Sequence, residues 1–348
     1  MRILIVGGTG LISSELSAIA LAEGDEVTLV NRGSAALPPA PGAHVIHADA
    51  TNPEALRAAL RGPRLRGEKF DAVIQFIAYH PQHVRDDVET FRRLTDRYVL
   101  IATSAAYRKQ DRLRPLTEDV PLENEHWEYA REKIACEEAL RDAAHAAGLP
   151  YVIVRPAHTY GDSKIPGFTG VSRHPWTLVD RIRRGADIIL PGDGTSLWTV
   201  THARDVAAGI RGLAWSPGAI GEAVHVTSSI PLTWRAIHDT IARAAGVEDL
   251  SDRYVCVPSD ALIAAAPSQE GSIRGDKMWP AVYDTSKLRA LVPGWEARIP
   301  FDEGVTSAVA WFEADPARQT IDHASNAMFD ALAARYREAL TETAADAG

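Results

Sequence analysis

The sequence has little cysteine, no long apolar run and no excess of basic charge. Its two cysteines, Cys136 and Cys256, lie far apart and fit no metal-ligand spacing, which predicts reduced thiols, no metal site and a cytoplasmic protein. No stretch approaches about 18 uninterrupted apolar residues, and the chain enters "RILIV" directly after Met1, so we expect neither a membrane span nor a signal peptide. A net charge of −9 and a pI near 5.7 argue against a nucleic-acid partner.

The first 156 residues alternate short apolar runs with segments of helical composition. Continuous apolar strands joined through helices require crossovers, and crossovers produce a parallel sheet that is covered on both faces. We therefore expect the α/β class, with a doubly wound parallel sheet of the Rossmann type and a smaller C-terminal α/β domain. The predicted strands are 2–6, 26–32, 43–49, 70–78, 97–104 and 149–156, and the predicted helices include 53–61, 81–96 and 125–147.

A glycine turn, "VGGTGLIS", joins the first strand to the first helix. Gly7 and Gly10 permit a tight turn and a close approach of the backbone to a pyrophosphate, and Ser13 stands where a third glycine would be. The N-terminus of the following helix, at Leu11 and Ile12, offers N–H groups and a positive dipole end. This pattern predicts a site for a dinucleotide cofactor.

The end of the second predicted strand bears on the identity of that cofactor. A carboxylate there would bind the adenosine ribose of NAD, but the sequence has Asn31 followed by Arg32. Arg32 could pair with the 2′-phosphate of NADP, so NADP is slightly favoured over NAD. Asp49, after the third strand, either contacts the adenine amino group or caps the helix that begins at Pro53.

Three tyrosine–lysine pairs share one spacing: "YAREK" (129–133), "YGDSK" (160–164) and "YDTSK" (283–287). The second lies among glycine and proline, and the tyrosine of the third precedes a helix-capping aspartate, so neither has a backbone that fixes the pair. The first lies within a predicted helix, where Tyr129 and Lys133 are one turn apart on one face. Lys133 is expected to lower the pKa of Tyr129 toward a value that suits proton transfer.

With these motifs the sequence resembles the extended short-chain dehydrogenase/reductase family, of the NAD-dependent epimerase/dehydratase type. The resemblance spans almost the whole chain and includes "RPAHTYG" (155–161), "GDGTSLWTVTHARDVA" (192–207) and "DTSKLRALVPGW" (284–295). Short segments of the sequence, including "KIACE", are similar to those of a branch of the family related to chloroplast stem-loop RNA-binding proteins. The resemblance implies that Ala78, Pro156 and Lys133 also contact the cofactor. It further implies a homodimer that pairs through helices such as those predicted at 81–96 and 125–147.

We expect the two domains to interleave along the chain, because the composition changes after residue 156 and a strand-like segment returns near residue 223. The predicted division is a dinucleotide-binding Rossmann domain of residues 1–158 and 194–228, and a substrate-binding domain of residues 159–193 and 229–348.

The resemblance also suggests a third catalytic residue. In "ATSAAYR", Thr103 stands four residues before Tyr107, where the family has a serine or threonine whose hydroxyl binds the reacting substrate oxygen beside Tyr129. Ser104 is the alternative for that role and a candidate substrate contact.

Several positions depart from the pattern of nucleotide-sugar enzymes. Trp198 stands where related epimerases have an arginine on the substrate diphosphate, and His158 stands where they have asparagine. Ser104 and Ala105 replace the Asp-Glu pair of sugar dehydratases, which excludes elimination by that route. Arg274 could still supply one positive charge to the substrate. A sugar-like substrate is therefore favoured over one that must carry a nucleotide diphosphate.

The interpretation that follows is an NAD(P)-dependent oxidoreductase that transfers a hydride at a secondary alcohol or ketone of a sugar-like substrate. Within it, a (nucleotide-)sugar epimerase is preferred because of the family. The alternative is a one-way NADPH-dependent ketoreductase, favoured by Arg32 and by the missing arginine at Trp198. A remote third hypothesis, an RNA-binding protein on an enzyme scaffold, is opposed by the acidic net charge and by the complete Thr-Tyr-Lys set.

Overall fold

The computed structural model describes residues 1–33, 37–62, 69–110, 115–168 and 173–346. Its main sheet consists of β1 (Arg2–Val6), β2 (Glu26–Asn31), β3 (His44–His47), β4 (Ala72–Gln75), β5 (Tyr98–Ile101), β6 (Tyr151–Pro156) and β11 (Ala223–Val226). The strands are parallel and follow the order β11-β6-β5-β4-β1-β2-β3. The order of connection reverses between β1 and β4, which opens a crevice at the carboxyl ends of these strands.

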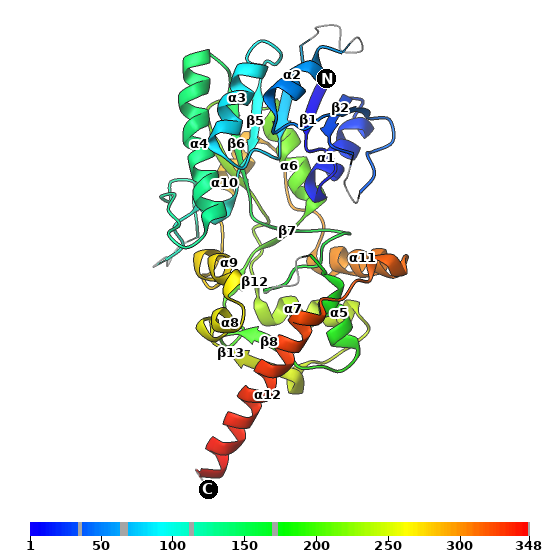
Figure 1. Cartoon of the computed structure of the whole chain (residues 1–348), viewed down its shortest axis with the longest axis vertical. Coiled ribbons are helices and arrows are strands. Elements are labelled where there is room, and N and C mark those ends of the chain that lie inside the picture. The colour runs from blue at the N-terminus through cyan, green and yellow to red at the C-terminus, as the bar shows by residue number, and fades with distance from the viewer. Residues whose placement is uncertain (34–36, 63–68, 111–114, 169–172, 347–348) are drawn as a thin grey trace.

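Helices cover both faces of this sheet (Figure 1). One layer is α1 (Leu11–Ala22), α6 (Ala203–Trp215) and α10 (Ser286–Leu291), and the other is α2 (Pro53–Leu60), α3 (Pro81–Phe91) and α4 (Glu128–Ala147). Along β1, Ile3 and Ile5 pack with the first layer, whereas Leu4 and Val6 pack with the second. Successive residues of a strand face opposite sides, so a strand that is apolar at every position needs both layers. The predicted doubly wound sheet is confirmed.

The second half of the molecule lies beyond the carboxyl edge of the sheet (Figure 1). Its core includes Trp176, Trp198 and Trp234, which form a cluster separate from the two cores of the sheet. Its strand pairs are β7 (His158–Tyr160) with β10 (Val200–His202), β8 (Ile188–Pro191) with β13 (Tyr254–Val257), and β9 (Leu197–Trp198) with β12 (Leu232–Thr233). Its helices are α5 (Trp176–Arg183), α7 (Trp234–Ala244), α8 (Ser259–Ala265), α9 (Glu270–Ser272), α11 (Phe301–Glu313) and α12 (His323–Asp346).

The boundary between the two halves differs from the predicted one. The sequence assigned all of 229–348 to the smaller domain, but Leu288 and Trp295 pack in the core on the α1/α6 face of the sheet. Trp295 donates its indole N–H to the carbonyl of Asp205 at 3.1 Å. A Cβ on Gly209 would lie 2.6 Å from Val226 and 3.0 Å from Trp295. The glycine therefore leaves the space in which Trp295 packs against the sheet.

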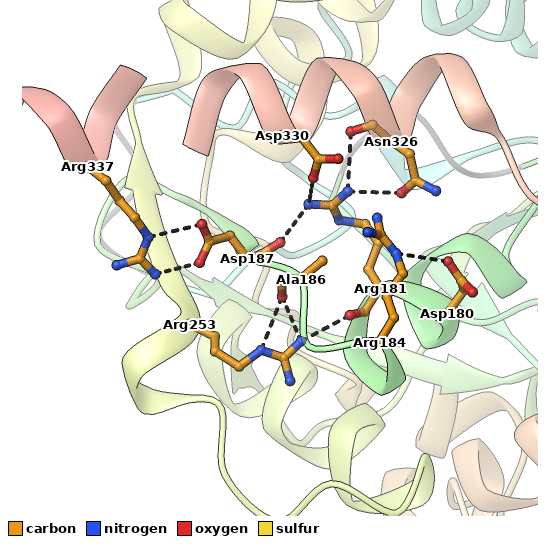
Figure 2. Close-up of polar contacts among 9 residues, drawn as sticks. All are labelled: Asp180, Arg181, Arg184, Ala186, Asp187, Arg253, Asn326, Asp330 and Arg337. Atoms are coloured by element: carbon orange, nitrogen blue, oxygen red, sulfur yellow. Dashed lines mark hydrogen bonds and ion pairs between the residues drawn. The ribbon is translucent and has the colours of Figure 1, made fainter. Parts of the chain in front are cut away.

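Arginines fasten the C-terminal helix α12 to the second half (Figure 2). Arg181 on α5 donates to the Asn326 side chain at 2.9 Å and pairs with Asp330 at 2.8 Å. Further along α12, Arg337 pairs with Asp187, next to β8. These contacts hold the helix where it leaves the body of the molecule in Figure 1. Among the described helices, none is both long and apolar enough to cross a membrane.

A buried carboxyl sets the path of the chain after β4. Asp87 on α3 accepts hydrogen bonds from the Gln75 amide at 2.6 Å and from the Tyr98 hydroxyl at 2.7 Å. The other end of Gln75 accepts from the Ile77 N–H at 2.8 Å. Burial raises the pKa of Asp87 to about 7, although the hydrogen bonds from Tyr98 and Gln75 act in the opposite direction. The network fixes residues 76–78 at the carboxyl edge of the sheet.

A buried ion pair holds α4 against the sheet. Arg155 on β6 donates to both carboxylate oxygens of Glu137, at 2.8 and 2.6 Å, and both side chains are almost fully buried. Arg155 also donates to the Tyr107 hydroxyl at 3.0 Å. Arg141, which is partly exposed, adds a second contact to Glu137 at 3.0 Å. Because the pair spans α4 and β6, it sets the position of every side chain that α4 presents to the crevice.

Substituting Glu137→Ala is expected to lower the free energy of unfolding by about 3–5 kcal/mol, because Arg155 is left buried without its carboxylate. Arg141→Ala is the matched control, since it removes only the partly exposed partner and should cost less than about 1 kcal/mol. Urea denaturation of both variants measures the difference. Equal losses would show that the buried pair does not hold α4 in place.

The raised pKa of Asp87 makes stability depend on pH. The pKa of an aspartate in the unfolded chain is about 3.9. The stabilising protonated form is therefore complete below about pH 4 and is lost as the pH rises through about 7. Asp87→Asn keeps the acceptor oxygen without titrating. Its stability relative to the wild type should increase between pH 4 and pH 7, by at most about 4 kcal/mol. Melting temperatures across this range, with Asp86→Asn as control, test the expectation; a constant difference would contradict it.

Candidate active site

A cavity of about 700 Å³ follows the carboxyl edge of the sheet into the second half of the molecule. Its position at the reversal of strand order is where open α/β sheets bind ligands, and its volume suits a small-molecule site. The predicted site residues that line it are Gly7, Gly10, Leu11, Ile12, Thr103, Ser104, Tyr129, Pro156, His158 and Trp198.

The glycine turn forms one end of the cavity. Gly7 has φ +85°, and a Cβ there would lie 2.6 Å from the Ile77 side chain, so only glycine fits. Ser13 ties the turn together, since its hydroxyl donates to the Gly7 carbonyl at 2.7 Å and accepts from the Gly10 N–H at 2.8 Å. The first turn of α1 presents N–H groups that have no acceptor within the helix. The turn therefore fits the pyrophosphate of a dinucleotide.

The residues predicted to bind adenosine lie outside the cavity lining. The Asn31 side chain accepts from the Gly33 N–H at 2.9 Å, and Arg32 is exposed at the end of β2. Asp49 is also exposed, and hydrogen bonds from Thr51 lower its pKa, with a smaller effect from Arg32. The alternative role of Asp49 as a helix cap is wrong: Asn52 caps α2, accepting from two backbone N–H groups at 3.1 Å.

Lys133 is anchored at the ends of two strands. It is buried, and its ammonium donates to the carbonyls of Ala78 at 2.8 Å and Ile101 at 2.9 Å. The Tyr79 ring lies 4.8 Å from the ammonium nitrogen. An ammonium has three donors, so these carbonyls leave one N–H for a ligand. Ala78 itself is fully buried and is not among the residues that line the cavity, so its contact with the cofactor stays a prediction.

Tyr129 and Thr103 meet at the cavity. Tyr129 lies one turn before Lys133 on α4, and the Thr103 hydroxyl forms a hydrogen bond with its phenol. The Thr103 hydroxyl also accepts from the Ala105 N–H at 3.2 Å, which fixes its orientation after β5. The structure thus brings a phenol, a hydroxyl and an anchored ammonium to one side of the cavity.

The predicted lowering of the pKa of Tyr129 is wrong for the ligand-free chain. Burial raises that pKa to about 12, although the hydrogen bond from Thr103 acts to lower it. Burial also lowers the pKa of Lys133 to about 8. The reason is that the phenol is removed from water, and Lys133 is not among the groups that shift its pKa. Tyr129 therefore carries its proton at neutral pH.

The other two tyrosine–lysine pairs are separated by the fold. The Tyr160 ring packs in the core of the second half, and Lys164 lines the cavity without it. Tyr283 is buried and donates to the Ser104 hydroxyl at 2.9 Å, while Lys287 forms a surface ion pair. Ser104 remains in the cavity wall, but this contact occupies its hydroxyl as an acceptor.

The cavity end in the second half is formed by His158 and Trp198, whose ring centroids lie 5.6 Å apart. Burial lowers the pKa of His158 well below its usual value, so the ring is neutral. Arg274 does not line the cavity, contrary to its predicted substrate contact. Its guanidinium pairs on the surface with Asp260 at 2.9 Å and Glu270 at 3.3 Å.

Sequence reasoning did not assign Asn124 to the site, but it joins three parts of it. Its amide donates to the carbonyls of Ala105 at 2.9 Å and Gly275 at 2.7 Å, and its oxygen accepts from the Trp127 N–H at 2.9 Å. The helix itself begins later, at Glu128. The reasoning also missed Lys164, Lys277, Asp276 and Tyr79, all of which line the cavity. For Lys164 and Lys277 the sequence offered one signal, which is that lysine is rare in this chain, with only six in total.

Comparison with known proteins agrees with this geometry. The model of the NAD dependent epimerase/dehydratase family matches residues 3–224. The 2′-dehydrokanamycin reductase of Streptomyces kanamyceticus is 26% identical over 304 residues, which cover 86% of this chain and 81% of the relative. A chloroplast stem-loop binding protein of 41 kDa from Arabidopsis thaliana is 25% identical over 256 residues, covering 70% of this chain and 63% of the relative.

The fold is shared with solved enzymes. A UDP-glucose 4-epimerase of Thermus thermophilus, solved in complex with NAD, has a TM-score of 0.70 at 22% identity, covering 90% of this chain and 99% of that one. At this identity the likeness concerns the fold. The family match spans well over half of the sequence and includes the glycine turn, Thr103, Tyr129 and Lys133. The chain belongs to the NAD dependent epimerase/dehydratase family.

Proposed function

We propose that the protein is an NAD(P)-dependent oxidoreductase that transfers a hydride at a secondary alcohol or ketone of a sugar-like substrate. The arrangement of one cavity supports the proposal. The glycine turn lines one end of this cavity, and Tyr129 and Thr103 meet in its wall, with Lys133 anchored behind them. A proton donor beside a dinucleotide site is what reversible carbonyl reduction requires.

The residues that would hold the cofactor are those of the turn and of the strand ends. The N–H groups at Leu11 and Ile12 would bind its pyrophosphate, and the third N–H of Lys133 would bind a ribose hydroxyl. Ala78 and Pro156 would contact it at the ends of β4 and β6, with Asn31, Arg32 and Asp49 near the adenosine. When bound, the cofactor supplies the hydride acceptor or donor; the chain supplies position and proton transfer.

Tyr129 moves the proton in this proposal. Because burial holds its pKa at about 12, it carries a proton that it can donate to the substrate oxygen as a carbonyl becomes an alcohol. Thr103 would orient the same oxygen by turning its O–H from Tyr129 to the substrate, while the Ala105 N–H holds the hydroxyl in place. When the product leaves, the Thr103 O–H can return to the phenolate and stabilise it, and solvent then restores the proton.

Within this proposal we favour one-way reduction with NADPH over the epimerisation that the sequence favoured. Trp198 stands where related epimerases have an arginine on the substrate diphosphate, and the similarity to a reductase covers 86% of the chain. A (nucleotide-)sugar epimerase remains the second candidate because of the family and the shared fold. Native mass spectrometry distinguishes them: an epimerase recycles its hydride and should retain stoichiometric NAD, whereas a reductase should release its oxidised cofactor.

The partners expected from the sequence are a small sugar-like molecule and a second copy of the chain. A homodimer through α3 and α4 stays a prediction, and the outer faces of these helices carry exposed charges such as Arg85, Glu89, Arg131 and Glu138. Such faces favour a polar interface over a permanent apolar one. A nucleic-acid partner is not proposed, since the net charge of −9 repels a phosphate backbone.

Tyr129→Phe is expected to lower turnover about 10²- to 10⁴-fold, because it removes the proton donor and leaves the ring in place. NADPH affinity should stay unchanged, which fluorescence titration measures. Tyr160→Phe is the matched control, since Tyr160 belongs to a pair of the same spacing but does not line the cavity. Steady-state oxidation of NADPH with a panel of keto sugars provides the rates, and undiminished turnover of Tyr129→Phe would refute the assignment.

Arg32→Gln is expected to weaken NADPH binding about tenfold and to leave NADH binding unchanged, because only NADPH offers a phosphate to the guanidinium. Arg93→Gln, which changes an exposed arginine that follows α3, controls for the change in net charge. Fluorescence titrations with both cofactors provide the dissociation constants. Equal losses for NADPH and NADH, or none, would remove the argument for NADP.

A further inference from the structure

Lysines gather around one end of the cavity. The chain has only six: Lys69, Lys109, Lys133, Lys164, Lys277 and Lys287. Apart from the catalytic candidate Lys133, three of these act electrostatically on His158, in the order Lys164, Lys277 and Lys109. Lys164 and Lys277 line the cavity, and the Lys109 ammonium lies 5.1 Å from the ring centroid of Trp198. The remaining two form surface ion pairs.

The carboxylate at this end of the cavity, that of Asp276, is already paired with a lysine. Asp276 lines the cavity and forms an ion pair with the buried Lys109. It belongs to a π-helical turn, Ile273–Lys277, which turns Asp276 toward Lys109 and brings the next residue into the cavity wall. Among the described residues that line the cavity, Asp276 is the sole carboxylate, and its ion pair is with Lys109 and not with either of the other two lysines.

Neither Lys277 nor Lys164 forms an ion pair with a described residue, although the charge of Asp276 acts on Lys277. Lys277 donates to two neutral acceptors, the carbonyls of Gly167 at 3.2 Å and Phe168 at 2.8 Å. Lys164 has neither a hydrogen-bond acceptor nor an ion-pair partner for its ammonium in the described part of the chain. Both side chains are half-buried in the cavity wall. Partial loss of hydration lowers the pKa of Lys277 to about 8, although Asp276 acts to raise it, and also lowers the pKa of Lys164. Holding two such ammonium groups together without an anion is costly.

Uncharged polar atoms at the same end also lack partners. The Nε2 atom of His158 and the indole N–H of Trp198 are buried, and neither has a hydrogen-bond partner in the described structure. The indole nitrogen can only donate, as can the two ammonium groups, so this end of the cavity is rich in donors. A ligand group that fits must accept hydrogen bonds and carry negative charge.

We infer that this end of the cavity is a subsite for an anionic group of the substrate, a carboxylate or a phosphate, bound by Lys164 and Lys277 beside His158 and Trp198. The inference rests on the proposed function, because it names the class of sugar-like substrate that would enter the cavity: a sugar acid or a sugar phosphate. An amino sugar, whose ammonium would meet the two lysines, is excluded by the same charges.

Thermal shift measurements on the whole chain test the inference with four probes at pH 7 and constant ionic strength: glucuronate, glucose 6-phosphate, glucose and glucosamine. A ligand that binds only the folded state raises the melting temperature. We expect a rise with at least one anionic sugar and none with glucose or glucosamine, and the stronger anion identifies carboxylate or phosphate. Equal shifts for charged and neutral sugars, or no shift with any, would overturn the inference.

Lys164→Met tests whether the rise in melting temperature with an anionic sugar comes from this subsite, because methionine keeps the apolar stem of the side chain and removes its charge. Its affinity for the anionic sugar should fall at least about tenfold, whereas Lys69→Met, which loses the same charge at the surface, should bind as the wild type does. Without ligand, Lys164→Met should melt no lower than the wild type, because an unpaired charge has been removed. If this variant fails to fold, the comparison of anionic and neutral sugars on the wild type still decides.

Cofactor titration separates this subsite from the phosphates of the dinucleotide. Lys164→Met should bind NADPH as tightly as the wild type does. A variant that loses NADPH affinity and keeps anionic-sugar affinity would overturn the inference, because the ammonium would then serve the cofactor. Tyr129→Phe should keep the anion-dependent shift. Loss of hydride transfer in that variant therefore tests the proposed function, and the shift tests the subsite independently.

Discussion

The two hydrogen bonds from Lys133 to the carbonyls of Ala78 and Ile101 are the constraint on which the site depends. They attach α4 to the ends of two adjacent strands at once, and Tyr129 lies one turn earlier on the same helix. Other buried contacts support both sides of this attachment. The Asp87–Gln75 network fixes the segment that carries Ala78, and the Glu137–Arg155 pair holds the next turn of α4. A shift of α4 would therefore displace Tyr129 and Lys133 together.

The cavity combines two kinds of electrostatic environment. At the glycine turn, backbone N–H groups and a helix N-terminus favour a bound phosphate without a charged side chain. At the other end, Lys164 and Lys277 supply charges, and the one described carboxylate in the lining, Asp276, forms its ion pair with Lys109. Tyr129 and Thr103 lie in the wall of the same cavity, where burial keeps the phenol protonated. The arrangement suits a reaction in which a polar substrate is held by its charged group and reduced at a neutral carbonyl.

Features that depend on local backbone could be predicted from the sequence. The parallel sheet follows from apolar strands alternating with helices, and the placement of the glycine turn and of Tyr129 with Lys133 follows from spacing within one element. Features that depend on distant residues could not. Lys277 reaches the cavity through a π-helical turn, Trp295 returns to the sheet beside Gly209, and Asn124 joins segments far apart in sequence. The pKa of Tyr129 was predicted in the wrong direction because spacing gives proximity to Lys133 but not the degree of burial.

A crystal structure of the protein with NADP⁺ would show whether the cavity at the carboxyl edge of the sheet holds the cofactor. We expect density for the pyrophosphate at the N-terminus of α1, with the nicotinamide ring in the cavity beside Tyr129 and its ribose within hydrogen-bond distance of Lys133. Calorimetry on the same preparation should show one dinucleotide per chain. Density at any other place, or no binding of NADP⁺ or NAD⁺ at millimolar concentration, would contradict this expectation.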